Sequence, residues 1–292
     1  MGFFEFLFRP QPKPAKAPAS PADRGSSPAP EQPQAQGPIP AQEPPRIQRA
    51  PLPAGRAKPR QEARLPGPFD QFVAAGLRAI RFIDKKGYRK ALAGVLYRKG
   101  HIIATDGHRL LKERVPIPAH LDEVIIPPEL FVAHRHVPIK TLSLTRDRKS
   151  LMVNGQPCRL IVGEKYPDTD SVTPTVFKFQ ITFDRLPVED ALRLAGESKQ
   201  AVFTTMMGNR LRMTVNQTVP PTVIPFKGQV ENTEFAFNPA FLLGVLRSLE
   251  GDNVTMKGNS PLSAFVFQGE QPERTALLMP VRITAEEMRA AA

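Results

Sequence analysis

The segment most suggestive of chemistry is residues 102–111, IIATDGHRLL. An apolar run precedes a turn at Asp106 and Gly107, where glycine readily adopts a positive φ, and His108 and Arg109 follow. An imidazole near a carboxylate resembles a general base, but no nucleophile is placed for it. An ordinary hairpin turn with one imidazole explains the same spacing, so the segment alone does not predict catalysis.

The remaining polar clusters give little support for catalysis. His134 and His136 have no cysteine or carboxylate nearby at the spacing of a metal site. There is no glycine-rich phosphate loop. Carboxylates at an expected helix start favour the helix dipole instead; these are Asp184, Glu189 and Asp190. We therefore expect a non-enzymatic protein with no catalytic residues, no metal and no cofactor.

The elements around these side chains form a repeated pattern. Helical patterns open at Phe69–Asp70 and again at Phe183–Asp184, and short helices begin at Pro128 and Pro239. Proline suits the first helical position, because its missing N–H would have no partner there. The helices expected at Phe183 and Pro239 follow those at Phe69 and Pro128 at a nearly constant distance along the sequence. This spacing predicts two copies of one unit.

Between and after the helices the pattern indicates β-strands. In the first copy the expected strands are 93–97, 101–104, 142–145, 151–153 and 159–162. In the second copy they are 201–204, 210–215, 234–237, 254–256, 263–267 and 276–279. Two helices with several short strands predict an α+β unit with antiparallel sheets.

Composition separates the chain into a folded body and an N-terminal tail. Seventeen of the 33 prolines lie within the first 68 residues, and this stretch has no periodic pattern. It has too little apolar surface to offset the entropy of ordering, so residues 1–65 are expected to be disordered.

Charge and cysteine content indicate the environment. The net charge of +12 favours a polyanionic partner. The single cysteine, Cys158, excludes an internal disulfide framework and fits a reducing compartment. No apolar run reaches the roughly 20 residues needed to cross a bilayer, and the first ten residues are a poor signal peptide. We expect a cytoplasmic, nucleoid-associated protein without a membrane partner.

Four strings together resemble the bacterial sliding clamp family, the beta subunit of DNA polymerase III. They are residues 104–110 (ATDGHRL), 166–168 (YPD), 237–242 (FNPAFL) and 278–282 (LMPVR). They occur in the order of the family and at compatible separations. The resemblance covers residues 66 to about 283 and matches the second and third of the three domains of that family.

The resemblance implies a domain division and marks two departures. The expected parts are a proline-rich tail (1–65), two clamp domains of the DNA-clamp processivity fold (66–174 and 175–284), and a short C-terminal extension (285–292). We expect the first domain of the family to be missing, with the proline-rich tail in its place. The chain also continues beyond Ile283, and Thr284 with Glu287 forms a capping-box pattern for a short helix.

Clamps of this family are rings of six similar domains that encircle duplex DNA, so two domains per chain imply a trimeric homo-oligomer. A monomer or open oligomer that kept the fold is the alternative. The implied partners are double-stranded DNA, DNA polymerase, other clamp-binding proteins with short linear motifs, and a clamp loader. The implied function is that of a processivity factor in DNA replication. The alternative is a non-encircling paralogue that docks or competes for replication proteins.

DNA contact in such rings is attraction to phosphates, independent of sequence. Residues 85–90, KKGYRK, hold four positive charges and align with a family loop that touches DNA. A solvated charged surface is the alternative interpretation of this loop. The expected DNA-binding residues are Lys85, Lys86, Arg89 and Lys90 in the loop, with Arg78, Arg81, Arg135, Arg193 and Lys199 on or near the helices.

The resemblance also implies a peptide pocket between the two domains. Its residues map onto Leu92, Thr105, Gly107, His108, Arg109, Leu110, Pro167, Val172, Asn238, Phe241, Ser263, Leu278, Met279, Pro280, Val281 and Arg282. Ser171 stands where the family commonly has arginine, and Phe241 where tyrosine is common, so the preferred guest is open.

The tail contains one further motif. Residues 4–8, FEFLF, form a short apolar segment that loosely resembles the linear motifs of clamp partners. Such a segment on a tether gains effective concentration for a nearby pocket. A sticky terminus or a weak membrane-surface contact is the alternative.

Overall fold

The structure, a computed structural model, describes residues 68–117, 121, 123–196, 198–216 and 219–283. The expected disordered tail, its apolar motif and the expected C-terminal helix all lie outside the described residues. We call residues 68–174 the first half and residues 175–283 the second half.

The first half alternates two helices with short strands. Its elements are α1 (Pro68–Ala79), a 3-10 turn η2 (Lys90–Ala93), β1 (Val95–Arg98), β2 (His101–Thr105), β3 (Arg109–Arg114), β4 (Val124–Ile126), α2 (Pro128–Ala133), β5 (Leu142–Leu144), β6 (Ser150–Val153) and β7 (Gln156–Arg159). Strands β5, β6 and β7 form a separate three-stranded sheet.

The second half repeats this alternation. Its elements are β8 (Phe179–Asp184), α3 (Arg185–Arg193), β9 (Ala201–Met206), β10 (Arg210–Thr214), β11 (Thr222–Gln229), β12 (Glu234–Phe237), α4 (Pro239–Leu246), β13 (Asn253–Gly258), β14 (Phe265–Gln268) and β15 (Arg274–Leu278).

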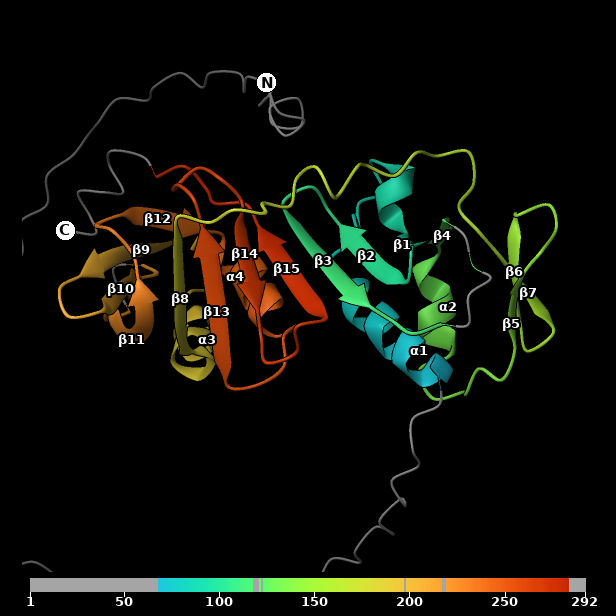
Figure 1. The fold of residues 1–292 in the computed structure, drawn as a ribbon, viewed down its shortest axis with the longest axis horizontal. Helices are drawn as coiled ribbons and strands as arrows, with labels where there is room; N and C mark the ends of the chain where they lie inside the picture. The colour runs from blue at the N-terminus through green and yellow to red at the C-terminus, as the bar shows by residue number, and fades with distance from the viewer. Residues whose placement is uncertain (1–67, 118–120, 122, 197, 217–218, 284–292) are drawn as a thin grey trace, which may run out of the picture. The chain divides into compact units, whose positions relative to one another are not determined.

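One antiparallel sheet runs through both halves. Its order is β12-β9-β10-β11-β8-β13-β14-β15-β3-β2-β1-β4. The halves join where β15 pairs with β3, from Arg274 opposite Glu113 to Leu278 opposite Arg109 (Figure 1). The junction is therefore a continuous backbone ladder.

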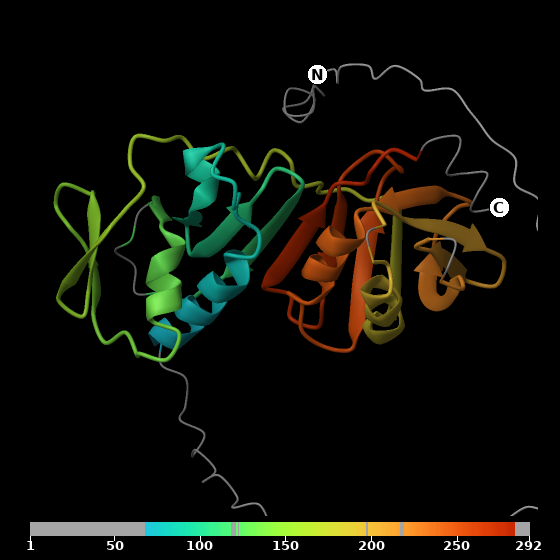
Figure 2. The same cartoon turned by 180° about the vertical axis from the view of Figure 1, so that it is seen from behind.

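Helices pack in pairs against this sheet. In Figure 2 the blue α1 and green α2 lie side by side, and α3 and α4 lie in front of the strands of the second half. The rings of Phe72 and Phe131 bring α1 and α2 together with centroids 5.2 Å apart. Gly76 permits this approach, since a Cβ there would lie 2.0 Å from the Phe131 ring.

The predicted helix starts are confirmed. Asp184 caps α3 by accepting from the backbone N–H of Leu186 at 3.0 Å, and Asn238 caps α4 by accepting from that of Phe241 at 3.1 Å. Pro128 and Pro239 occupy first-turn positions, where no backbone donor is lost. The predicted α+β class with antiparallel sheets is confirmed as well.

Several strand predictions were wrong. The strand expected at 159–162 lies instead at Gln156–Arg159, and Ile161 makes only an isolated bridge to Ile125. Strands β3, β4, β8 and β11 were not predicted. Strand β3 ends in the charged run KER, and β11 contains Pro225 and Gly228, both of which weaken a strand signal.

Candidate functional site

The turn between β2 and β3 is held by its own side chains. The Thr105 hydroxyl donates to the Arg109 carbonyl at 2.8 Å and accepts from the Gly107 N–H at 3.0 Å. One Asp106 carboxylate oxygen accepts from the N–H groups of His108 and Arg109. Gly107 has a φ of +90°, which glycine adopts without strain. Asp106 is thus a structural acceptor in this turn.

Arg109 extends from the turn toward both halves. Its guanidinium carbon lies 5.0 Å from the ring centroid of Phe82 and 4.7 Å from that of Phe241. It donates to the Arg81 carbonyl at 2.7 Å and to the Asp106 carboxylate at 3.0 Å. Arg109 therefore connects the end of α1, the turn and the first turn of α4.

Helix α4 must leave space for this guanidinium. A Cβ at Gly244 would lie 2.4 Å from Nη1 of Arg109. The His108 ring stacks on the Phe241 ring, with centroids 5.5 Å apart and planes 29° apart. The half-buried Phe241 is thus in contact with both side chains that follow the turn.

The segment that follows β15 brings the last predicted string to the same place. The Met279 N–H donates to the His108 carbonyl at 2.9 Å, and the Val281 N–H donates to the Ala236 carbonyl at 2.8 Å. Met279, Pro280 and Val281 are half-buried, and Arg282 is exposed. Three of the strings that were separate in the sequence are therefore neighbours in the fold.

Other predicted pocket residues lie beneath this surface or beside it. Leu92 and Leu110 belong to a buried cluster with Tyr166, and Leu278 is fully buried. The Tyr166 hydroxyl accepts from the Thr105 N–H at 3.1 Å, and burial raises the pKa of this phenol. Three more predicted pocket residues are half-buried: Pro167, Val172 and Ser263. The Ser263 hydroxyl forms hydrogen bonds with the backbone of Ser260 in a local turn.

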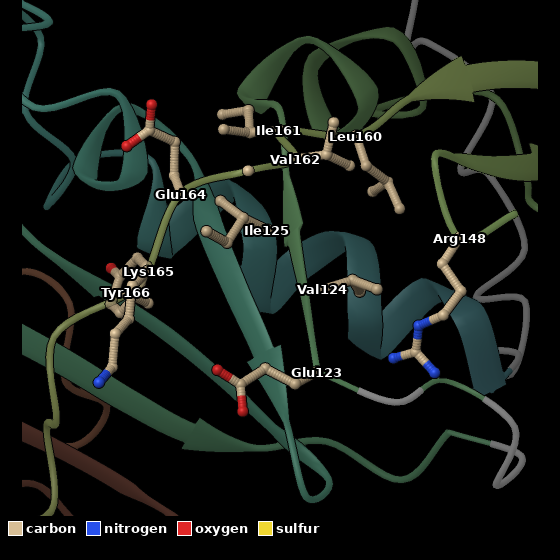
Figure 3. Close-up of a pocket in the computed structure, with 11 residues that line it drawn as sticks. Glu123, Val124, Ile125, Arg148, Leu160, Ile161, Val162, Glu164, Lys165 and Tyr166 are labelled. Carbon is tan, nitrogen blue, oxygen red and sulfur yellow. The ribbon is translucent and has the colours of Figure 1, made fainter.

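A cavity of about 520 Å³ lies in the first half, between β4 and the segment after β7. Its aliphatic lining comes from Val124, Ile125, Leu160, Ile161 and Val162 (Figure 3). Figure 3 shows charged side chains around it, with Arg148 on one side and Lys165 on the other. None of the predicted pocket residues lines this cavity.

One carboxylate, that of Asp84, accepts hydrogen bonds from the backbone of the basic loop at residues 85–90. Asp84 accepts from the N–H of Lys86 at 3.0 Å and from that of Arg89 at 3.3 Å. Gly87 has a φ of +68°. The four predicted cations of the loop are all exposed: Lys85, Lys86, Arg89 and Lys90. The loop therefore presents its charge to solvent.

The predicted cations of the helices differ in their surroundings. Arg78 donates to the Glu113 carboxylate at 3.0 Å, and Arg193 pairs with Glu189 at 3.1 Å and with Asp190. Arg78 is thus paired with a buried carboxylate, whereas Arg193 is paired but itself exposed. Three others are exposed and lie beyond the helix ends, so their expected placement on the helices was wrong: Arg81, Arg135 and Lys199.

A buried ion-pair network lies where the halves join. Arg274 on β15 and Glu113 on β3 are only 2% and 6% exposed, and two of their N···O distances are 3.0 Å. Arg274 also pairs with Glu250 and donates to the Ser248 carbonyl. Burial alone would raise the pKa of Glu113, but the hydrogen bonds and charges of Arg78 and Arg274 outweigh it and lower that pKa.

Sequence reasoning placed none of four residues that organise the predicted site in the pocket. Phe82, Asp106, Tyr166 and Gly244 each contact a residue of the turn or its arginine, as described above. Two of them carried a sequence signal: Asp106, since aspartate before glycine is typical of a turn, and Tyr166, which belongs to the string at 166–168. Phe82 and Gly244 carried none.

Among the described residues, no group of three or more His, Cys, Asp and Glu side chains is arranged to hold a metal ion. No described helix is long and apolar enough to span a membrane.

Solved structures with the same arrangement of elements decide the fold. The beta chain of DNA polymerase III from Streptococcus pneumoniae TIGR4 matches with a TM-score of 0.63 and 21% identity, over 73% of this chain and 63% of that one. The beta sliding clamp of C. crescentus matches with a TM-score of 0.64 and 21% identity, over 73% and 64%. The fold is that of a bacterial beta sliding clamp.

Sequence comparison agrees with this similarity. The curated beta sliding clamp of Streptococcus pneumoniae TIGR4 is 24% identical over 204 residues, which are 62% of this chain and 53% of that protein. This chain therefore spans about half the length of the curated beta clamps that it matches. No family model matches the chain. A further beta clamp neighbour, from Bartonella birtlesii, was solved bound to griselimycin, with a TM-score of 0.63 and 18% identity over 73% and 64% of the chains.

Proposed function

We propose that this chain is a two-domain, sliding-clamp-like processivity factor that holds duplex DNA without sequence specificity. The observation that carries the proposal is the beta clamp fold, continuous across the β15–β3 junction. The exposed cations of residues 85–90 and of Arg81, Arg135 and Lys199 supply attraction to phosphates. Catalysis is left to a partner polymerase.

The proposed units are clamp domains at 66–174 and 175–284, assembled head to tail as a trimeric ring. The β15–β3 ladder supports this idea, because through it the second half of the chain continues the sheet of the first. Strand β7 is an edge of the three-stranded sheet, with one side available for pairing. A clamp loader would open such a ring on DNA in the cytoplasm, next to the nucleoid.

The proposed peptide pocket is the surface around Phe241 and Met279. Its support is the meeting of three segments: the turn with His108 and Arg109, the start of α4, and the segment that follows β15. The thioether of Met279 adapts to varied apolar guests, and the exposed His108 and Arg282 offer polar contacts at the rim. Peptide motifs of polymerases and repair factors are the proposed guests.

Retention on circular DNA tests the clamp. The full chain is loaded on nicked circular duplex with its loader and compared on the same DNA after linearisation. A ring stays on the circle and slides off the linear form, whereas equal retention on both contradicts encirclement. Charge reversal of Lys85, Lys86, Arg89 and Lys90 to Glu should weaken retention and flatten its salt dependence.

A non-encircling docking module is the second candidate. It is favoured by the ion pairs of Arg78 and Arg193, which reduce the positive charge that the helices offer to DNA. This candidate predicts capture of clamp-binding peptides at the Phe241 surface with no difference between circular and linear DNA. Retention on circular and on linear DNA therefore distinguishes the two candidates.

A further inference from the structure

Tyr88 is an aromatic ring left in water at the tip of the basic loop. Tyr88 is 82% exposed, whereas Tyr97 and Tyr166 are only 3% and 5% exposed. The chain contains only these three tyrosines and no tryptophan. A ring in this position adds little to the core and is available to a ligand.

The loop is built to present this ring. Asp84 holds the backbone on both sides of Tyr88 through the N–H groups of Lys86 and Arg89. The Gly87 N–H also donates to the Asp84 carbonyl at 3.1 Å. The positive φ of Gly87 turns the chain just before the tyrosine. These contacts fix the loop from its base and leave its tip to solvent.

Positive charge surrounds the ring. Lys85, Lys86, Arg89 and Lys90 are exposed, and Nζ of Lys86 lies 5.9 Å from the Tyr88 ring centroid. An aromatic face among cations is the combination with which proteins bind single-stranded nucleic acid, because bases stack on the ring and phosphates pair with the cations. Bases inside a duplex are already stacked on both faces and leave no face for the ring.

We propose that Tyr88 stacks on an unpaired DNA base while the four loop cations hold the neighbouring phosphates. The inference rests on the proposed function and deepens it, since it names single-stranded DNA beside the duplex as a ligand of this loop. A docking protein is the less favoured occupant, because an apolar protein contact gains nothing from four cations around the ring.

Fluorine NMR tests the stacking directly. The full chain is labelled with 3-fluorotyrosine, and the Tyr88 resonance is assigned by its loss in Tyr88→Phe. A thymidine homopolymer should shift the Tyr88 resonance and leave those of the buried Tyr97 and Tyr166 in place. A blunt duplex, whose phosphates pair with the same four cations, should shift the Tyr88 resonance less than the homopolymer does and leave the other two in place. A Tyr88 resonance that does not respond to the homopolymer overturns the inference.

Affinities measured by anisotropy of labelled DNA complete the test. Tyr88→Ala should weaken homopolymer binding by about five- to hundredfold and leave duplex binding unchanged, while Tyr88→Phe should bind as the parent does. Homopolymer binding by Tyr88→Leu equal to that of the parent overturns stacking, since leucine offers no aromatic face. Lys86→Ala, the matched control, should weaken both DNA forms.

These outcomes are separate from the circular-DNA test. Retention on circles with a homopolymer affinity unchanged in Tyr88→Ala refutes only the stacking. Tyr88-dependent homopolymer binding without preference for circles refutes only the encircling clamp.

Discussion

Replacement of Arg274 by methionine should destabilise the junction between the halves. The guanidinium is 2% exposed and forms ion pairs with Glu113 and Glu250. Removing one partner of a buried ion pair costs about 3–5 kcal/mol, because the other charge is left in a poor solvent. Arg78 still pairs with Glu113, so we expect the lower end, about 3 kcal/mol.

Urea unfolding followed by circular dichroism measures this loss, and a double-mutant cycle shows its origin. Glu113→Met alone should also destabilise, since it leaves Arg274 without its main partner. The double variant should lose less than the sum of the single losses by at least about 1 kcal/mol, whereas independent sites add within about 0.5 kcal/mol. Additive losses, or an Arg274→Met loss below about 1 kcal/mol, would refute the reasoning.

The same network predicts a pH dependence. Because the folded-state pKa of Glu113 is lowered from its ordinary 4.5, its contribution is complete above that pH and is lost as the pH falls through the folded-state pKa. Glu113→Gln should therefore remove part of the loss of stability that is expected below pH 4.5. If the free energy of unfolding of this variant falls at low pH as steeply as that of the parent, Glu113 makes no such contribution.

Three further predictions concern other parts of the fold. Gly76→Ala should lower stability by about 1–3 kcal/mol in thermal unfolding despite the better helix propensity, because its Cβ meets the buried Phe131 ring; a more stable variant would contradict this packing. Phe241→Ala and Met279→Ala should abolish capture of a clamp-binding peptide in calorimetry while keeping the parent's circular dichroism spectrum, and retained capture would place the guest elsewhere. Asp84→Ala should speed amide hydrogen exchange in the basic loop, since two backbone N–H groups lose their acceptor, and unchanged exchange would show that Asp84 does not hold it.

Helix starts were predictable because their causes are local. Proline at the first turn of α2 and α4, and Asp184 and Asn238 as caps, act on backbone groups within a few residues. The apolar strands β2 and β12 were predictable for the same reason, since period and side-chain type are local properties. The predicted site strings likewise carried recognisable turn and cap residues.

The failures have a non-local cause. Strand β3 reads as polar toward its end, yet Glu113 is buried, because β15 places Arg274 opposite it. Strand β11 contains Pro225, but pairing with β10 and β8 keeps the segment extended. In each case the neighbour that decides the conformation is distant in the sequence, so no local window contains it.

The sequence by itself determined the α+β class, the helix starts and the strings that resemble a beta clamp. Only the tertiary structure decided what Arg109 does: it lies between Phe82 and Phe241, against the space left by Gly244. A turn residue and a helix residue far along the chain meet there because β3 and β15 pair. The chemistry of the turn therefore depends on a strand register that local sequence does not encode.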